Sequence, residues 1–179
     1  DALAVEEPWV GALILAPALK TSNYLEIVDD LVKAKKLPHL KHVIRLGREK
    51  TPGMLNFDDV ATSGGNAEKV KLAELAPKLQ FDDAINIQFT SGTTGHPKGA
   101  TLSHHNILNN GYFVGEGLKL TPADRLCIPV PLYHCFGMVL GNLAAVSHGA
   151  TIVIPAPVFD PYDTLAAVEA ERCTALHGV

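Results

Sequence analysis

The clearest chemical signal is the eleven-residue segment FTSGTTGHPKG at residues 89–99. It combines four hydroxyl side chains, three glycines and one lysine, Lys98. Glycines let successive backbone N–H groups converge on one anion, hydroxyls donate short neutral hydrogen bonds, and a lysine supplies a full positive charge. The composition and spacing therefore predict a phosphate-binding loop.

This segment differs from two other loop motifs. In the GxxxxGK[ST] loop a glycine precedes the lysine and a hydroxyl residue follows it, whereas Pro97 and Gly99 flank Lys98 here. Because proline has no backbone N–H, we expect phosphates to bind earlier, at residues 91–95, with Pro97 stiffening the exit. A GxSxG nucleophile elbow is excluded because Phe89 stands where its first glycine belongs. The alternative is a polar turn between a strand and a helix with a solvated lysine.

Three segments together resemble a known family. TSGTTGHPKG at residues 90–99 closely resembles the phosphate-binding motif of the adenylate-forming superfamily, which groups acyl-CoA synthetases, luciferases and peptide-synthetase adenylation domains. PLYHCFG at 131–137 resembles a second motif of that superfamily in its acyl-CoA synthetase form, whereas amino-acid adenylation domains typically read FDxS there. ATLSHHN at 100–106 is similar to the continuation in fatty-acid and medium-chain ligases. The resemblance is strong over residues 85–179 and weak over 1–84.

The resemblance implies an ATP-dependent reaction in two steps. A carboxylate, expected to be a fatty acid, attacks the α-phosphate of ATP to give acyl-AMP and pyrophosphate, and coenzyme A then takes the acyl group. Backbone donors, Lys98 and Mg²⁺ would hold the β- and γ-phosphates where negative charge develops. Lys98 is the expected catalytic residue. The expected cofactor-binding residues are Thr90, Ser91, Gly92, Thr93, Thr94, Gly95, Pro97 and Gly99.

The second motif is expected to border the acyl group. His134 resembles the gating position of the family, where a ring lines the acyl pocket and moves between the two steps. The other interpretation is a histidine packed in a loop between a strand and a helix. The expected substrate-binding residues are Tyr133, His134, Phe136 and Gly137.

Two other chemistries are disfavoured in this region. Cys135 beside His134 does not predict a Cys–His hydrolase, because adjacent residues do not generally face each other. No metal site is expected from the histidines and cysteine near the motifs, because they lack a standard zinc-ligand spacing. These residues are His104, His105, His134 and Cys135.

Length and composition bound the remaining possibilities. The 179 residues suffice for a hydrophobic core, and 47% hydrophobic against 19% charged residues, without a long uncharged apolar run, fit a globular domain. A net charge of −4 disfavours nucleic-acid binding, and no transmembrane segment is expected. The cysteines at 127, 135 and 173 form no CxxC pair, which favours a reducing compartment, expected to be the cytoplasm.

Residues 85–179 alternate between strand and helix patterns. Apolar runs rich in Ile and Val predict the strands, and Ser103 and Asp160–Pro161 predict two helix starts. Strands are expected at 85–90, 125–130, 150–154 and 174–177, and helices at 103–116, 137–147 and 160–172. Because strand, helix and strand repeat three times, we expect an α/β fold: a three-layer α/β/α Rossmann-like subdomain with a mainly parallel sheet.

Residues 1–84 are less regular and are expected to form the first part of the N-terminal adenylation domain. Apolar patterning predicts a helix capped by Ser22 and ended by Pro38. Strands are expected at 10–15 and 42–46, and a further helix at 67–79. Seven basic residues lie between 33 and 50, which favours a solvated helix end and loop, with coenzyme A or a membrane surface as alternatives.

The chain is expected to be a piece of a longer protein, since it begins at Asp1 without methionine and stops within an apolar pattern. In the family, the acidic Mg²⁺ ligand, the ribose-binding aspartate and a mobile C-terminal domain with a catalytic lysine would lie beyond Val179. The 179 residues alone are therefore expected to be inactive. The alternative from another class is a non-catalytic α/β module that binds a nucleotide or phosphate.

Overall fold

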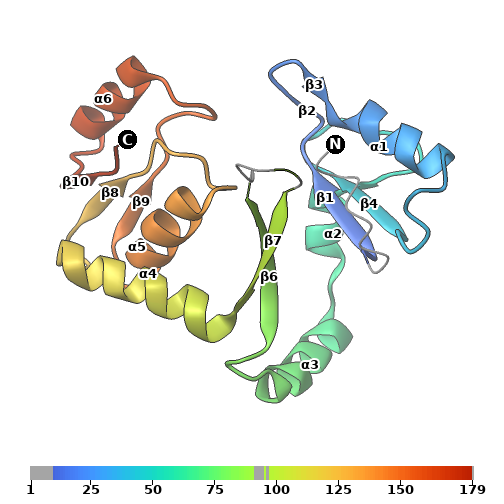
Figure 1. Cartoon of the computed structure of the whole chain (residues 1–179), viewed down its shortest axis with the longest axis horizontal. Coiled ribbons are helices and arrows are strands. Elements are labelled where there is room, and N and C mark those ends of the chain that lie inside the picture. The colour runs from blue at the N-terminus through green and yellow to red at the C-terminus, as the bar shows by residue number, and fades with distance from the viewer. Residues whose placement is uncertain (1–9, 91–94, 96, 179) are drawn as a thin grey trace. The chain divides into compact units, whose positions relative to one another are not determined.

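The computed structural model describes residues 10–90, 95 and 97–178. The chain forms two compact units, residues 1–78 and 79–179, and each is described by itself. Figure 1 shows the elements of both. No helix in these described ranges is long and apolar enough to cross a membrane.

The first unit is built on a parallel sheet of order β1-β4-β5, in which Ile14 lies beside Ile44 and Ile44 beside Leu55. A short antiparallel ribbon, β2–β3, leads into helix α1, whose Val28 is buried. The strands are β1 (Ala12–Leu15), β2 (Ala18–Leu19), β3 (Ser22–Asn23), β4 (His42–Arg45) and β5 (Leu55–Asn56). The helices are α1 (Tyr24–Lys33), α2 (Phe57–Ser63) and α3 (Asn66–Leu75), followed by the 3₁₀ turn η1 (Ala76–Lys78).

The start and end of α1 differ from the sequence prediction. Asn23, not Ser22, caps the helix, because its extended backbone lets its side-chain oxygen accept the Glu26 N–H at 3.4 Å. Ser22 instead pairs with Leu19 in the ribbon. The helix also ends at Lys33, before Pro38, and the positive φ of 55° at Lys35 turns the chain away.

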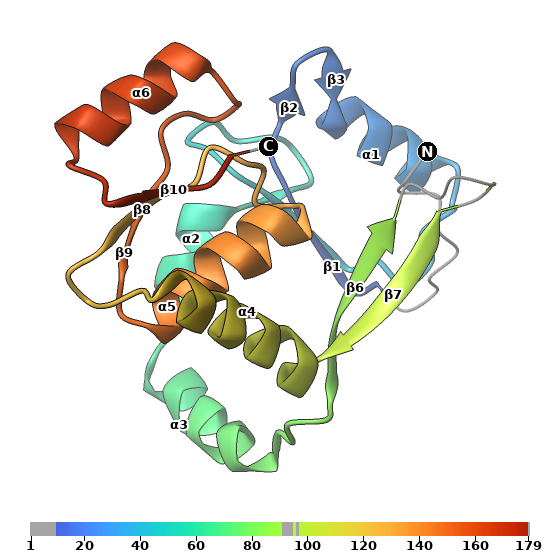
Figure 2. The same ribbon diagram turned by 60° about the vertical axis from the view of Figure 1, so that its left-hand side comes forward.

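The second unit contains a parallel sheet of order β10-β8-β9, formed by β8 (Arg125–Cys127), β9 (Thr151–Val153) and β10 (Ala175–Leu176). In both views α6 (Pro161–Ala170) lies on one side of these strands, and α4 (His104–Leu118) and α5 (Ala144–Ser147) lie on the other (Figures 1 and 2). The expected α/β/α layering with parallel strands is confirmed in this unit.

The core of the second unit lies between β8 and the helices that follow it. Leu126 and Ile128 are each 1% exposed and pack in one cluster with Ala144 and Ala145. A side chain at Gly141 would meet Ile128 at 2.9 Å, so the helix approaches the strand closely at this glycine. The helix expected at 137–147 is in fact a π-helix, η2 (Phe136–Leu143), continued by α5.

One of the three expected crossovers is wrong. The strand predicted at 85–90, observed as β6 (Ala84–Thr90), does not join the parallel sheet but pairs antiparallel with β7 (Lys98–Ser103). The segment 98–103 (KGATLS) escaped prediction because Leu102 is its only large apolar residue. The phosphate-binding motif therefore connects two strands of a hairpin rather than a strand and a helix.

The two predicted caps of the second unit are confirmed. Ser103 accepts the Asn106 N–H, and the Asn106 side chain accepts the Ser103 N–H at 2.9 Å, which closes a capping box. Asp160 accepts the Asp163 N–H at 2.9 Å, and Pro161 occupies the first turn of α6.

Helices α4 and α5 meet around His148, whose side chain is 8% exposed. The His148 ring stacks on Tyr112, with ring centroids 5.1 Å apart. Its Nδ1 lies 3.0 Å from the Ala144 carbonyl and its Nε2 lies 3.1 Å from a Glu116 carboxylate oxygen. A side chain at Gly115 would overlap the ring, so glycine is required for this approach.

Gly115→Ala is expected to lower the free energy of unfolding by about 1–3 kcal/mol, because the new methyl group must displace His148. Gly117→Ala, in the same helix, meets open space and should raise stability by about 0.5 kcal/mol through helix propensity. Urea denaturation of the 179-residue chain, followed by circular dichroism, measures both. Equal stability of the two variants would contradict the packing described for α4 and α5.

Candidate functional site

The hairpin places Thr90 and Lys98 at the two ends of the phosphate-binding motif. Thr90 is the last residue of β6, Lys98 is the first of β7, and the two pair directly. Side chains of directly opposed residues lie on the same face of an antiparallel pair. Thr90 Oγ1 also lies 3.5 Å from the Lys98 carbonyl oxygen. A hydroxyl and an ammonium group therefore stand together at the base of the loop.

The loop itself is described only in part. Gly95 has a φ of +148°, a backbone conformation that side chains disfavour, and Pro97 is exposed. The expected phosphate contacts at Ser91, Gly92, Thr93 and Thr94 lie outside the described residues.

Gly99 has a packing role in the hairpin. It pairs with Phe89, and a Cβ atom here would lie 3.2 Å from the Phe89 ring and 2.9 Å from Ile87 Cγ2. The absence of a side chain lets both apolar groups lie across β7. Its assignment to cofactor binding stays a prediction.

The second motif forms a tight turn at the start of η2. The His134 N–H donates to the Pro131 carbonyl at 3.2 Å, and the His134 carbonyl accepts the Met138 N–H at 3.0 Å. Gly137 is buried against Pro131, and a side chain there would overlap the Pro131 carbonyl oxygen. Tyr133 and His134 are exposed on this turn.

The hydrogen bonds of His134 fix which ring nitrogen carries the proton. The Phe136 N–H donates to His134 Nδ1 at 3.1 Å, so Nδ1 acts as an acceptor and the neutral ring carries its hydrogen on Nε2. Cys135 Sγ lies 3.7 Å from the same Nδ1, so the expectation that these neighbours do not face each other is wrong. The nitrogen is already used by a backbone N–H, which leaves it poorly placed to act as a base toward Cys135.

A hydrogen bond joins the strand that leads into the first motif to the second motif. Gln88 Nε2 donates to the Tyr133 carbonyl oxygen at 3.0 Å, across 45 residues of sequence. It brings the hairpin that carries Thr90 and Lys98 against the turn that carries His134. Sequence analysis missed Gln88, although the alternation of Asn86 and Gln88 with apolar residues along this strand was a usable signal.

Sequence analysis also missed His177. Its ring meets Phe136 edge-on, with centroids 5.1 Å apart, and its Nε2 lies 2.8 Å from the Leu140 carbonyl. Beside it, a largely apolar cavity of about 500 Å³ opens at the carboxyl ends of β8 and β10. The edge where parallel strands end is where α/β proteins commonly bind ligands. The cavity is lined by Pro129, Val130, Pro131, Phe159, Pro161, Thr164, Leu165, Leu176, His177 and Gly178.

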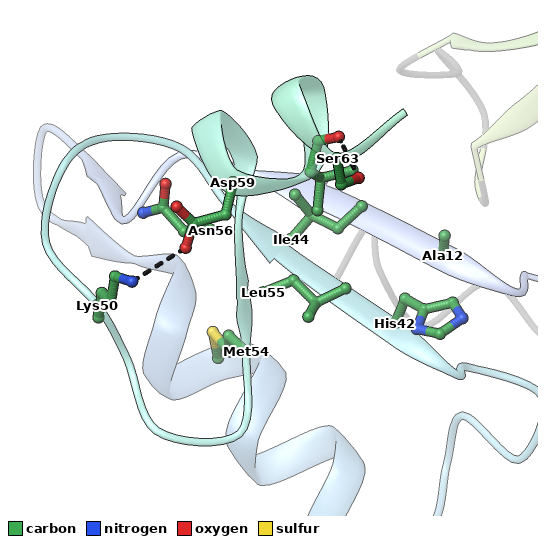
Figure 3. Close-up of a pocket in the computed structure, with 10 residues that line it drawn as sticks. Ala12, His42, Ile44, Lys50, Met54, Leu55, Asn56, Asp59 and Ser63 are labelled. Atoms are coloured by element: carbon green, nitrogen blue, oxygen red, sulfur yellow. Dashed lines mark hydrogen bonds and ion pairs between the residues drawn. The ribbon is translucent and has the colours of Figure 1, made fainter. Parts of the chain in front are cut away.

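The first unit has a cavity of its own, of about 650 Å³, which contains none of the motif residues. Figure 3 shows its apolar floor on β4 and β5, including Ile44 and Leu55, and the ion pair between Lys50 and Asp59. That pair measures 3.0 Å. The basic segment 33–50 is thus partly neutralised.

Two further basic residues of this segment are paired as well. Lys33 bonds to Asp29, and Arg45, only 5% exposed, bonds to Glu49 at 2.7 Å. These pairs reduce the positive charge that the segment could offer to coenzyme A or to a membrane surface. Exposed Lys33 and Lys50 fit the interpretation as a solvated helix end and loop, whereas Arg45 is buried in β4 and does not.

Two perturbed groups of the second unit belong to the scaffold. Burial raises the pKa of the Cys127 thiol in β8. Hydrogen bonds from Thr174 and Thr121 lower the pKa of the Asp124 carboxyl, which ties the start of β8 to the approach to β10. Neither group lies in the two motifs.

The comparisons with known proteins agree on one family. The family model described as AMP-binding enzyme matches residues 10–179. A putative acyl-CoA synthetase of Bacillus subtilis, YngI, is 42% identical over 180 residues, which cover 94% of this chain and 33% of the relative. The mitochondrial medium-chain acyl-CoA ligase ACSF2 of Danio rerio is 38% identical over 98% of this chain and 31% of the relative. The chain thus spans about one third of the length of these relatives.

Solved structures share the fold. An anthranilate CoA ligase, AuaEII, in complex with anthranoyl-AMP superposes with a TM-score of 0.72 at 20% identity, over 94% of this chain and 30% of that chain. A putative long-chain-fatty-acid CoA ligase from Rhodopseudomonas palustris gives 0.72 at 22% identity, over 94% and 38%.

Gly137→Ala is expected to lower the free energy of unfolding by about 1–3 kcal/mol, because the Pro131 carbonyl belongs to the backbone and cannot rotate away. Gly178→Ala, where no atom lies within 4 Å of the added group, should change it by less than about 0.5 kcal/mol. Thermal unfolding measured by calorimetry compares the two. A fully stable Gly137→Ala variant would show that the turn does not require this close approach.

Proposed function

Because the chain belongs to the AMP-binding enzyme family, we propose that it forms part of an ATP-dependent acyl-CoA synthetase. In the proposed reaction a fatty-acid carboxylate displaces pyrophosphate from ATP to give acyl-AMP. The thiol of coenzyme A then displaces AMP and releases its proton, giving the acyl thioester. The observation that best supports this function is the Gln88–Tyr133 hydrogen bond, because it places a phosphate-type motif beside an acyl-CoA synthetase-type motif.

The phosphate end of the reaction is assigned to the hairpin. An anion must attack a polyanion, and the departing pyrophosphate gains negative charge as it leaves. Lys98 supplies a positive charge at the base of the loop, and Thr90, paired with it, supplies a hydroxyl donor. Charge placed in advance where negative charge develops lowers the barrier more than it strengthens ground-state binding.

The acid end is assigned to the turn that carries His134. With Nδ1 accepting the Phe136 N–H, the ring presents Nε2–H as a neutral donor. A neutral donor can orient a carboxylate without neutralising it, which preserves the nucleophile. Tyr133, Phe136 and Gly137 complete the proposed substrate-binding set, and the medium-chain ligase among the relatives supports an aliphatic acid.

Magnesium is part of the proposed reaction but has no ligand set among the described residues. No group of three or more His, Cys, Asp or Glu side chains in residues 10–90, 95 and 97–178 could hold a metal ion. In this proposal its acidic ligand, the ribose-binding aspartate and the lysine of a C-terminal domain come from outside the chain.

A reducing compartment, such as the cytoplasm, is proposed from the cysteines. Cys127, Cys135 and Cys173 all carry free thiols. The ACSF2 relatives are named as mitochondrial, so the cytoplasm is not the one compartment that the relatives suggest.

Acid-dependent exchange of labelled pyrophosphate into ATP, together with thioester formation from coenzyme A, tests the proposed function in the full-length enzyme. Exchange that requires a fatty acid supports it. Nucleotide binding with neither activity would favour the non-catalytic module.

Lys98→Ala is expected to lower kcat for pyrophosphate release by about 10²–10³-fold and to leave the acid KM nearly unchanged, because the charge acts on the leaving group. Lys98→Arg should retain most of the rate. Lys71→Ala, on exposed α3, serves as the matched control with unchanged rate. An unchanged kcat with a raised acid KM would contradict the assignment.

His134→Ala is expected to change the relative kcat/KM for acids of different chain length while the ATP KM stays within about twofold, because the ring borders the acid and not the nucleotide. Steady-state kinetics over a series of straight-chain acids measures this. His42→Ala, an exposed histidine of the first unit, is the control. An equal loss for every acid, with a lower melting temperature, would support a merely packed histidine.

A further inference from the structure

Strand β6 separates its side chains into two kinds. Ile85, Ile87 and Phe89 alternate with Asn86 and Gln88. The apolar set is 38–48% exposed, whereas Asn86 and Gln88 are partly buried. Because alternate residues of a strand share a face, Gln88 stands on the same face as Thr90, about 7 Å along the strand.

The partner of Gln88 is the peptide group that leads into His134. The Tyr133 carbonyl and the His134 N–H belong to one planar amide. Gln88 holds its oxygen at 3.0 Å, and the Pro131 carbonyl accepts its N–H at 3.2 Å. Both polar atoms of the plane are therefore held, and rotation of this plane would break both bonds.

The ring of His134 is in turn tied to its own backbone. The Phe136 N–H donates to its Nδ1, so the ring direction follows the peptide framework of residues 133–136. Fixing the Tyr133–His134 plane thus fixes the direction of the Nε2–H.

Within the described parts of the chain, the Gln88 bond is the one hydrogen bond that joins the β6–β7 hairpin to residues 131–137. A partly buried surface glutamine contributes little to the core. Its geometry suits it to set the distance and orientation between two sites.

We propose that Gln88 is a positioning residue for acid activation, which orients His134 relative to the phosphate-binding hairpin by holding the Tyr133–His134 peptide plane. This assignment rests on the proposed function. Gln88 does not touch the acid or ATP in this role. It acts through His134, and its effect should vanish when that ring is removed.

The decisive experiment is a double-mutant cycle between Gln88→Met and His134→Ala in the full-length enzyme. Methionine keeps the length of the side chain and removes the donor. Gln88→Met should lower kcat/KM for the acid about tenfold and leave the ATP KM within about twofold. In the His134→Ala background the same substitution should cost less than about twofold. Gln80→Met, at the only other glutamine of the chain, should have no effect.

Hydrogen exchange of the same enzyme provides a readout that does not depend on activity. The His134 amide should exchange about tenfold faster in Gln88→Met than in the unsubstituted enzyme, because one side of its peptide plane is released. Unchanged exchange, or additive losses in the cycle, would overturn the assignment. If the unsubstituted enzyme shows no acid-dependent exchange of pyrophosphate, the proposed function fails, and the hydrogen-exchange result alone decides the structural role of Gln88.

Discussion

Burial of strand β8 between helices on both sides is the interaction on which the second unit depends. Leu126 and Cys127 of β8, and Ile128 directly after it, are at most 1% exposed, and burying each of the two larger side chains contributes about 1.5–3 kcal/mol. The chain leaves this strand directly into residues 129–137. The rigid strand therefore fixes one end of the turn that carries His134, and η2, packed on Ile128 through Gly141, fixes the other.

Three glycines stand where two segments approach too closely for a side chain, and these close contacts fix where the segments lie. Gly141 lets η2 reach β8, Gly137 lets the turn fold onto Pro131, and Gly99 lets Phe89 and Ile87 cover β7. In each case a methyl group would have to displace an apolar side chain or a backbone carbonyl. Protein interiors transmit such displacements because they are close-packed. These three glycines are thus needed for close packing, and not only for backbone freedom.

The parts that sequence predicts well are those with local causes. Ser103 and Asp160 cap helices by bonds to residues three positions away, and the apolar runs around Leu126 and Ile152 form parallel strands as expected. Strand β7 could not be found this way, because small and polar residues form a strand only when β6 lies beside them. The cap at Asn23 depends on the β2–β3 ribbon for the same reason. Composition located the two motifs, but their juxtaposition through Gln88 is a long-range contact that no local pattern contains.

In the proposed site, the positive charge and the group that orients the acid lie on two different segments. In the proposed reaction the positive charge must act on pyrophosphate, not on the attacking carboxylate, since neutralising the carboxylate would weaken it as a nucleophile. Lys98 on the hairpin is the charged group of the two motifs, whereas the turn offers a histidine whose Nδ1 already accepts a backbone N–H. A neutral donor at one end and a fixed cation at the other need a defined separation, and the single Gln88 bond between hairpin and turn is the element that can supply it.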